Sequence, residues 1–130
     1  MKTPNPTEGE LAILRVLWRR QEPMTVREVH EALTRTKATA YTTVLKMLTI
    51  MAEKGLVRRD ESERSHTYIP VHKEERVQSA LLDDLMQRAF SGSAINLVQR
   101  ALDNSSTSAE DLDAIAKLIA KAKAKARRES

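Results

Sequence analysis

The segment from Thr39 to Pro70 constrains the fold of this chain most, because it joins an amphipathic helix, a glycine stop and a short basic hairpin. Its first part has apolar residues at helical spacing that should face a core, namely Ala40, Val44, Met47, Leu48 and Met51. Gly55 stands where a left-handed helix cap is needed, and Leu56 supplies the apolar residue that folds back over such a cap. Residues 56–61 and 65–70 then predict two strands around a turn. This order is typical of a winged helix-turn-helix, which points to duplex DNA as the ligand.

The other face of this helix carries short hydroxyl side chains and one long cation. Thr39, Thr42, Thr43 and Lys46 should share this face, and the last three project from the N-terminal half of the helix, where base contact is expected in this architecture. Threonine offers a hydroxyl and a methyl group, while lysine can reach guanine acceptors. Ordinary solvated positions are the alternative for the two threonines. Near the helix start, where backbone amides and the helix dipole favour an anion, we expect phosphate contacts from Lys37, Thr39 and Tyr41.

The hairpin supplies a second set of candidate DNA contacts, from Arg59, Arg64 and Ser65. Successive residues of a strand point to opposite faces, so only one of Arg58 and Arg59 is expected to meet DNA. A ring packed beside the first helix, rather than a phosphate contact, is the alternative for Tyr41. The hairpin is therefore expected to act as the wing of the domain.

The distribution of charge agrees with a DNA-facing helix. The chain of 130 residues has a net charge of +4, and residues 1–72 hold 12 Lys and Arg against 9 Asp and Glu. No acid occurs between Glu31 and Glu53, whereas Arg35, Lys37 and Lys46 lie in that interval. A surface without acids attracts phosphate. Chance in a moderately charged helix is the alternative explanation.

Two earlier helices complete the predicted N-terminal domain, residues 1–72. Each begins with a capping box, in which a threonine is followed three residues later by a glutamate, at Thr7 with Glu10 and at Thr25 with Glu28. The first helix should start at Glu8 and end near Arg20, and the second should end near Thr34. Residues 35–38 then form the turn before the third helix. The expected fold is mainly α with a small β hairpin.

Residues 73–130 change in composition and predict a helical dimerisation domain. One long helix should end before Ser91-Gly92-Ser93, a second should precede a polar turn at residues 103–107, and Ser108 can cap a last one. Their apolar stripes exceed what the small wing domain can cover, so a two-fold dimer is expected. A closed monomeric bundle is the alternative. The expected dimer contacts are Leu81, Leu82, Leu85, Met86, Phe90, Ile95, Val98, Leu102, Leu112, Ile115 and Ile119.

Four segments together resemble the penicillinase-repressor family, the BlaI, MecI and CopY group of bacterial winged-helix transcriptional repressors. They are TEGELAILRVLW at 7–18, MTVREVHEAL at 24–33, AYTTVLKMLTIMAEKGLVRR at 40–59 and FSGSAINLVQRAL at 90–102. The resemblance implies that the third helix enters the major groove and that the hairpin lies along flanking phosphates or the minor groove. It also implies a homodimer, formed through the C-terminal region, on a dyad operator in double-stranded DNA.

The resemblance suggests how repression is relieved. In this family a membrane sensor metalloprotease often cuts the repressor in its C-terminal region, and the aligned bond here is Arg100–Ala101. Better-known members have asparagine and phenylalanine at that bond, so this chain departs from the pattern. Copper sensing through a C-terminal cysteine motif is not expected, because the chain has no cysteine. A small-molecule effector bound in the dimer region is the open alternative.

Other classes of function have little support in the sequence. The chain has no cysteine, no glycine-rich phosphate loop and no repeated His/Asp constellation, so we expect no enzyme activity, no metal site and no cofactor. No apolar run could span a bilayer and the N-terminal residues lack a secretory signal, which predicts a cytoplasmic protein without membrane insertion. The rival from another class is a winged-helix protein-interaction adaptor. An acid-rich third helix would have favoured this rival, but the predicted third helix has no acid before Glu53.

Overall fold

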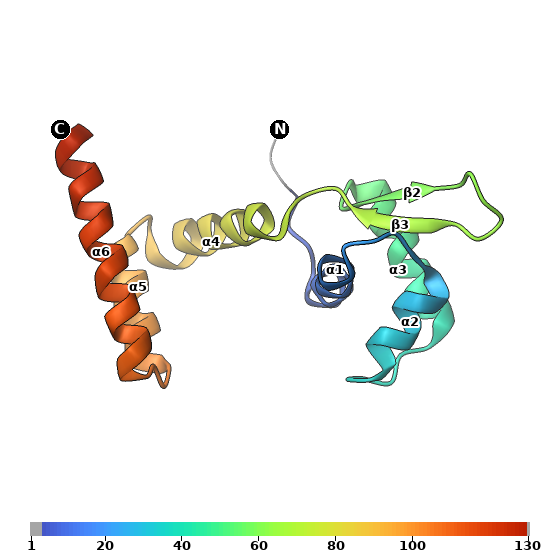
Figure 1. The fold of residues 1–130 in the computed structure, drawn as a ribbon, viewed down its shortest axis with the longest axis horizontal. Helices are drawn as coiled ribbons and strands as arrows, with labels where there is room; N and C mark the ends of the chain where they lie inside the picture. The colour runs from blue at the N-terminus through green and yellow to red at the C-terminus, as the bar shows by residue number, and fades with distance from the viewer. Residues whose placement is uncertain (1–3, 130) are drawn as a thin grey trace. The chain divides into compact units, whose positions relative to one another are not determined.

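A computed structural model describes residues 4–129 in two compact units, which divide after Leu85 (Figure 1). The first unit contains α1 (Glu8–Arg20), β1 (Met24–Thr25), α2 (Val26–Thr34), α3 (Tyr41–Lys54), β2 (Val57–Asp60) and β3 (Thr67–Pro70). The helix α4 (Glu74–Phe90) continues into the second unit, which contains α5 (Ala94–Asn104) and α6 (Ala109–Glu129). The mainly α fold with a winged helix is confirmed. The domain boundary expected between residues 72 and 73 falls just before α4 and stays a prediction. Residues 1–3 and 130, which are the ends of the two expected domains, lie outside the described part.

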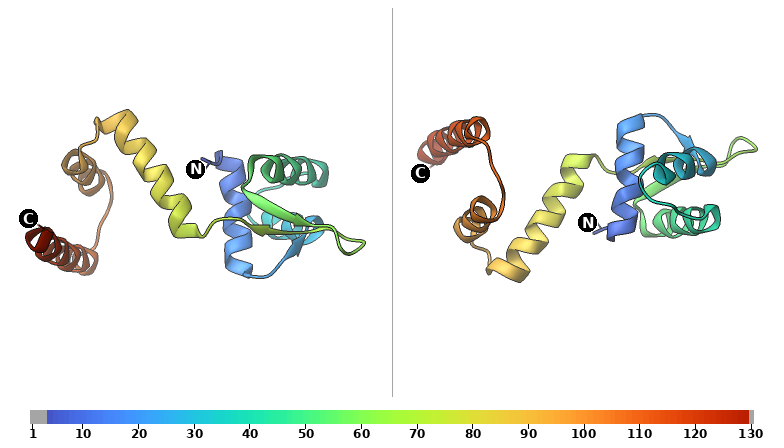
Figure 2. Two further views of the ribbon diagram at one scale, coloured as in Figure 1. Left: turned by 90° about the horizontal axis from the view of Figure 1, so that it is seen from above. Right: turned by 90° about the horizontal axis from the view of Figure 1, so that it is seen from below.

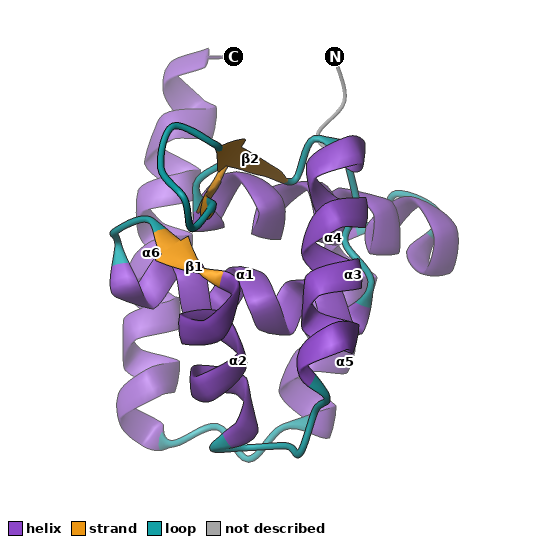
Figure 3. Cartoon of the chain, turned by 90° about the vertical axis from the view of Figure 1, so that its right-hand side faces the viewer, coloured by secondary structure: helices purple, strands orange, loops and turns teal. Residues whose placement is uncertain are grey.

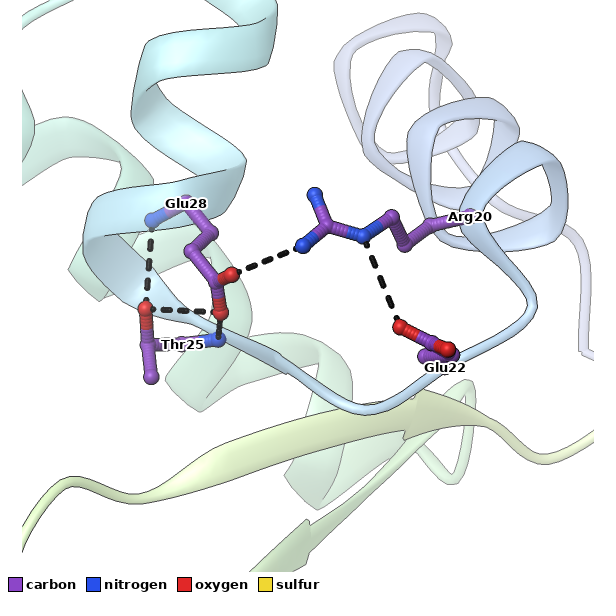
Figure 4. Close-up of polar contacts among 4 residues, drawn as sticks. All are labelled: Arg20, Glu22, Thr25 and Glu28. Atoms are coloured by element: carbon purple, nitrogen blue, oxygen red, sulfur yellow. Dashed lines mark hydrogen bonds and ion pairs between the residues drawn. The ribbon is translucent and has the colours of Figure 1, made fainter.

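Both predicted capping boxes are present and fix the starts of α1 and α2. The Thr7 hydroxyl accepts a hydrogen bond from the Glu10 amide at 3.2 Å, and the Thr7 amide donates to the Glu10 carboxylate at 2.8 Å. Thr25 and Glu28 repeat this arrangement at 3.2 and 2.9 Å (Figure 4). The Glu28 carboxylate also accepts from Arg20 at 3.0 Å. This last bond ties the end of α1 to the start of α2.

The core of the first unit forms where α1, α2, α3 and the sheet meet. Its side chains, all at most 2% exposed, include Ile13, Leu14, Leu17, Val29, Val44, Leu48, Met51, Leu56, Val57 and Tyr68. Ala40, which we expected in this core, is exposed instead. The reason is that α3 begins at Tyr41, so Ala40 is the extended N-cap residue, with φ −69° and ψ 144°, and lies outside the helical period.

The sheet is small beside the helices (Figure 3). Its three antiparallel strands lie in the order β1-β3-β2, with Met24 and Arg59 both registered with Tyr68 of the central strand. The two-residue strand β1 was not predicted, and the other two strands are shorter than expected. In both views of Figure 2 the loop that joins β2 to β3 extends away from the helices of this unit.

The glycine stop after α3 is confirmed. Gly55 has φ 81°, and its amide donates to the Ala52 carbonyl at 3.3 Å. The Leu56 amide donates to the Met51 carbonyl at 2.9 Å, and the Leu56 side chain is buried. These two bonds are the Schellman motif, in which a left-handed residue satisfies the last carbonyls of a helix. The motif turns the chain from α3 directly into the wing.

The start of α4 is anchored on the first unit. Val77 is 1% exposed, and the indole nitrogen of Trp18 on α1 donates to the His72 carbonyl at 3.0 Å. Trp18 itself is half-buried and packs against the core.

Within the described residues, no helix is both long and apolar enough to cross a membrane.

The helices of the second unit begin and end close to the predicted positions. Ser91 and Gly92 have positive φ after α4, and Ser93 caps α5 by accepting from the Asn96 amide at 3.2 Å. Ser108 accepts from the Asp111 amide at 3.0 Å at the start of α6. The polar turn begins at Ser105, later than expected, because α5 continues to Asn104. Among residues 86–129, none is buried.

Candidate nucleic-acid interface

The helix α3 presents the predicted reading residues together on its outer side. Val44, Leu48 and Met51 are each 0% exposed, so they fix which side of the helix faces inward. Thr42 and Lys46, one helical turn apart, are exposed on the other side, and Thr43 is exposed beside them. The structure therefore groups these three side chains on one solvent-facing surface.

The residues just before α3 are arranged differently from the prediction. Thr39 precedes the helix and is half-buried, and its hydroxyl donates to the Lys37 carbonyl at 3.1 Å. Thr39 therefore does not share the helix face with Thr42, whereas Lys37 is exposed in the turn. The N-cap residue Ala40 makes no side-chain capping bond, in contrast to Thr7 and Thr25.

Tyr41 is the first residue of α3 and is 45% exposed. Its aromatic neighbour is His30 on α2, at 5.7 Å between ring centroids and 73° between ring planes. Tyr41 therefore lies at the end of the helix where a phosphate contact was expected.

An ion pair holds the C-terminal end of α3 to the N-terminal end of α1. The Lys54 ammonium lies 2.7 Å from the carboxylate of Glu10, which is 5% exposed. Burial acts to raise the pKa of Glu10, but hydrogen bonds from Lys54 and the Thr7 backbone outweigh it, so the pKa lies below its ordinary value. The two helices also approach closely at Gly9, where a Cβ would lie 2.8 Å from the terminal methyl of Met47. The helix α3 is thus held to α1 near its C-terminal end as well as through its buried side.

The wing carries the predicted cations, but not all of them are equally available. Arg59 lies 2.7 Å from the Glu61 carboxylate, and interactions with Tyr68 and Glu61 raise the pKa of its guanidinium. Arg64 and Ser65 lie in the turn between the strands and are exposed. A phosphate would have to compete with Glu61 for Arg59, whereas the part of the structure described here gives Arg64 no such ion pair.

Two apolar residues of α3 that were not among the predicted contacts also lie on its exposed surface. Leu45 is 42% exposed and Ile50 is 38% exposed. Both are out of phase with the buried stripe of Val44, Leu48 and Met51, which is the signal that could have identified them. Apolar side chains at such positions suit thymine methyl groups.

The predicted dimer residues are distributed over three helices and are incompletely covered. On α5, Ile95 is 80% exposed, and Val98 and Leu102 follow it at helical spacing. The remaining positions are either exposed (Leu82, Leu85, Leu112 and Ile119) or half-buried (Leu81, Met86, Phe90 and Ile115).

The bond aligned with the family cleavage site lies inside a helix. Arg100 and Ala101 are exposed residues of α5, and Arg100 lies 3.9 Å from Asp103 one turn later. The Ala101 carbonyl accepts from the Ser105 hydroxyl at 2.7 Å.

In the described part of the chain, no three His, Asp or Glu side chains are grouped so as to hold a metal ion.

Known proteins resemble this chain over most of its length. The transcriptional regulator BlaI of Mycobacterium tuberculosis (strain CDC 1551 / Oshkosh) is 38% identical over 120 residues, which are 88% of this chain and 83% of that protein. The solution structure of Bacillus licheniformis BlaI, in its monomeric form with the blaP half-operator, has a TM-score of 0.50 and 26% identity over 58% of this chain and 93% of that one. The solution structure of the DNA-binding domain of the repressor BlaI gives the same values.

The family itself is identified by a match along nearly the whole sequence. The penicillinase repressor family model matches residues 6–121. The chain therefore belongs to the penicillinase repressor family, whose members are transcriptional regulators and not enzymes, as the sequence predicted.

Proposed function

We propose that this protein is a dimeric transcriptional repressor that binds a dyad operator through α3 and the wing. The observation that carries the proposal is the exposed face of Thr42, Thr43 and Lys46, on a helix that is buried on its other side. The chain has no acid from residue 32 to residue 52, so this face is open to phosphate and to base edges. The similar BlaI of Bacillus licheniformis was solved with a half-operator, which agrees with this choice of ligand.

The role of each residue follows from its position. Thr42, Thr43 and Lys46 would read bases in the major groove. Lys37 and Tyr41 would contact phosphates at the start of α3. Thr39 would instead hold the shape of the turn before the helix, through its hydrogen bond to the Lys37 carbonyl. In the wing, Arg64 and Ser65 would bind the flanking backbone, and Arg59 would join them only by leaving Glu61.

Dimerisation is supported by the apolar side chains of α4, α5 and α6. Ile95, Val98 and Leu102 form one apolar stripe on α5, and Leu112, Ile115 and Ile119 form another on α6. An unpaired chain would leave these stripes in water, at a cost of about 25 cal/mol for each Å² of apolar surface. A two-fold dimer would cover them and would hold two reading helices about 34–36 Å apart, or a multiple of that distance.

A binding titration tests the proposal. The purified protein is titrated onto duplex DNA from its own promoter region and onto a scrambled duplex, over a series of salt concentrations. We expect tight promoter binding, two protomers for each site, and a plot of log K against log salt that steepens by about 0.9 for each phosphate neutralised. Weak binding that is equal on both duplexes would contradict the proposal and would favour the adaptor alternative.

We propose that the inducing signal acts on α5, by cleavage at Arg100–Ala101 by a membrane sensor metalloprotease. Both residues are exposed, but a protease binds extended chain, so α5 would have to open locally before the cut. Cells exposed to a penicillin should then contain a C-terminal fragment that begins at Ala101, detectable by mass spectrometry. Loss of operator binding by an intact chain would favour the small-molecule effector instead.

A further inference from the structure

We propose that His30 is a positioning residue that holds the turn before α3 in the shape needed for DNA binding. The inference rests on the proposed function, but it concerns a residue outside the set proposed above to contact DNA. His30 belongs to α2, lies beside the buried Val29, and is half-buried itself. It is thus attached to the rigid part of the domain.

The imidazole makes two contacts across to the start of the reading helix. Its Nε2 lies 2.7 Å from the Thr39 carbonyl oxygen, and its ring meets the Tyr41 ring edge to face at 5.7 Å. A carbonyl oxygen only accepts, so Nε2 must carry the proton and donate it. One side chain of α2 therefore fixes residues on both sides of Ala40, the N-cap of α3.

The other bonds of this turn are local and cannot replace His30. The amides of Thr36 and Lys37 both donate to the Leu33 carbonyl, at 3.1 and 3.0 Å, and the Thr39 hydroxyl donates to the Lys37 carbonyl. These bonds hold residues 36 and 37 to the end of α2, but none of them joins Thr39 or Tyr41 to that helix. Arg35, Thr36, Lys37 and Ala38 are all exposed, so packing does not hold the turn either. Without His30, Thr39 and Tyr41 would lose their shared anchor, and Lys37 would point less consistently toward a phosphate.

Two substitutions at this position separate its hydrogen bond from its aromatic contact. His30→Phe keeps an aromatic edge for Tyr41 but removes the donor to Thr39. His30→Gln keeps an N–H donor at the same reach and removes the ring. Trp18→Phe is the matched control, because it also deletes one ring N–H donor to a backbone carbonyl, that of His72, on another side of the same domain.

The first measurement is the Kd for the promoter duplex and the scrambled duplex, at a temperature where thermal melts show every variant fully folded. The His30→Phe protein should bind the promoter about 3–10-fold more weakly than the wild type, which is the range for one net hydrogen bond. Its binding to the scrambled duplex should change less. His30→Gln should recover most of the affinity, and Trp18→Phe should match the wild type. Equal weakening by His30→Phe and Trp18→Phe would overturn the proposal, because it would leave only a general effect on stability.

The second measurement needs no DNA. Arg35 and Lys37 place two exposed trypsin sites in the turn, and cleavage in the native state follows how often the turn opens. Cleavage after Lys37 should be about 3–10-fold faster in His30→Phe than in the wild type, and near the wild-type rate in His30→Gln. An unchanged rate in His30→Phe would overturn the anchoring role. If the wild type fails to prefer its promoter, the proposed function fails, and the cleavage rates still decide whether His30 anchors the turn.

Discussion

Glu10 serves two elements with one carboxylate. It completes the cap of α1 with Thr7 and receives the ammonium of Lys54 from the far end of α3. Because its pKa in the folded state lies below the ordinary value of 4.5, the folded protein binds fewer protons than the unfolded chain near that pH. The stabilisation is therefore complete above about pH 4.5 and is lost as the pH falls through the folded pKa.

The substitution Glu10→Gln tests this at the residue scale. Glutamine can keep the capping geometry but not the charge, so the free energy of unfolding at pH 7 should fall by about 1–2 kcal/mol. The difference in free energy of unfolding between Glu10→Gln and the wild type should shrink as the pH is lowered below 4.5, the ordinary pKa of glutamate. Urea unfolding at a series of pH values measures both effects. Glu8→Gln, an exposed acid of the same turn, is the control, and a pH profile unchanged by Glu10→Gln would contradict the assignment.

Lys46 and Arg64 should affect DNA binding in different ways. Lys46→Ala removes a base contact, so promoter binding should weaken by about tenfold and scrambled-duplex binding by less. Arg64→Ala removes a phosphate contact, so both should weaken and the salt slope should fall by about 0.9. Titration of both variants on both duplexes measures this. Equal losses on the two duplexes for Lys46→Ala would mean that it does not read bases.

At the scale of elements, local rules predicted the helices well and the approaches to them less well. Both capping boxes placed the starts of α1 and α2, and Gly55 placed the end of α3, because each signal acts within one turn of the chain. The start of α3 has no such signal, since its N-cap is Ala40. The spacing of apolar residues alone therefore placed Ala40 inside the helix, one residue before its true start. The strand β1 was missed because its two residues are defined only by pairing with β3, which lies distant in the sequence.

The candidate site shows the same division between local and distant information. The spacing of Thr42, Thr43 and Lys46 on one helix could be read from the sequence. The pairing of Arg59 with Glu61 and the approach of His30 to Thr39 could not, because they depend on side-chain directions and on how two helices pack.

The capping box of α2 gives a prediction at this scale. Thr25→Ala removes the hydroxyl that accepts from the Glu28 amide and donates to the Glu28 carboxylate, whereas the backbone amide of residue 25, the main cause of the lowered Glu28 pKa, can still donate (Figure 4). The free energy of unfolding should fall by about 1 kcal/mol, as for other lost N-caps. Thr25→Ser keeps the hydroxyl and should stay near the wild type in the same urea titration. A loss as large in Thr25→Ser would point to the methyl group instead.

At the scale of the whole molecule, the two halves differ in how they are stabilised. The first unit has a buried core, whereas no residue from 86 to 129 is buried. A helical segment without a core of its own gains stability by packing against another surface. On the proposed function, that surface is a second copy of the chain, and the operator would require both copies.

A charge placed on the α6 stripe should separate the copies. Ile119→Glu should weaken dimerisation by about 10–100-fold, because the carboxylate would be buried without a partner. Sedimentation velocity over a range of concentrations measures the change, and promoter binding should weaken with it. Ala124→Glu adds the same charge to an exposed residue outside that stripe and should leave the dimer intact. A dimer unaffected by Ile119→Glu would mean that the α6 stripe is not part of the interface, and a wild type that is monomeric at every concentration would favour the closed monomeric bundle.

The hydrogen bond from Trp18 to the His72 carbonyl makes this protein its own optical reporter. Trp18 is the one tryptophan of the chain, and its indole sits where the wing passes into α4. Its emission therefore comes from a single place, the joint between the DNA-binding domain and the helix that leaves it. A red shift on operator binding, without any loss of helical circular dichroism, would reveal that α4 detaches from α1 while both remain folded.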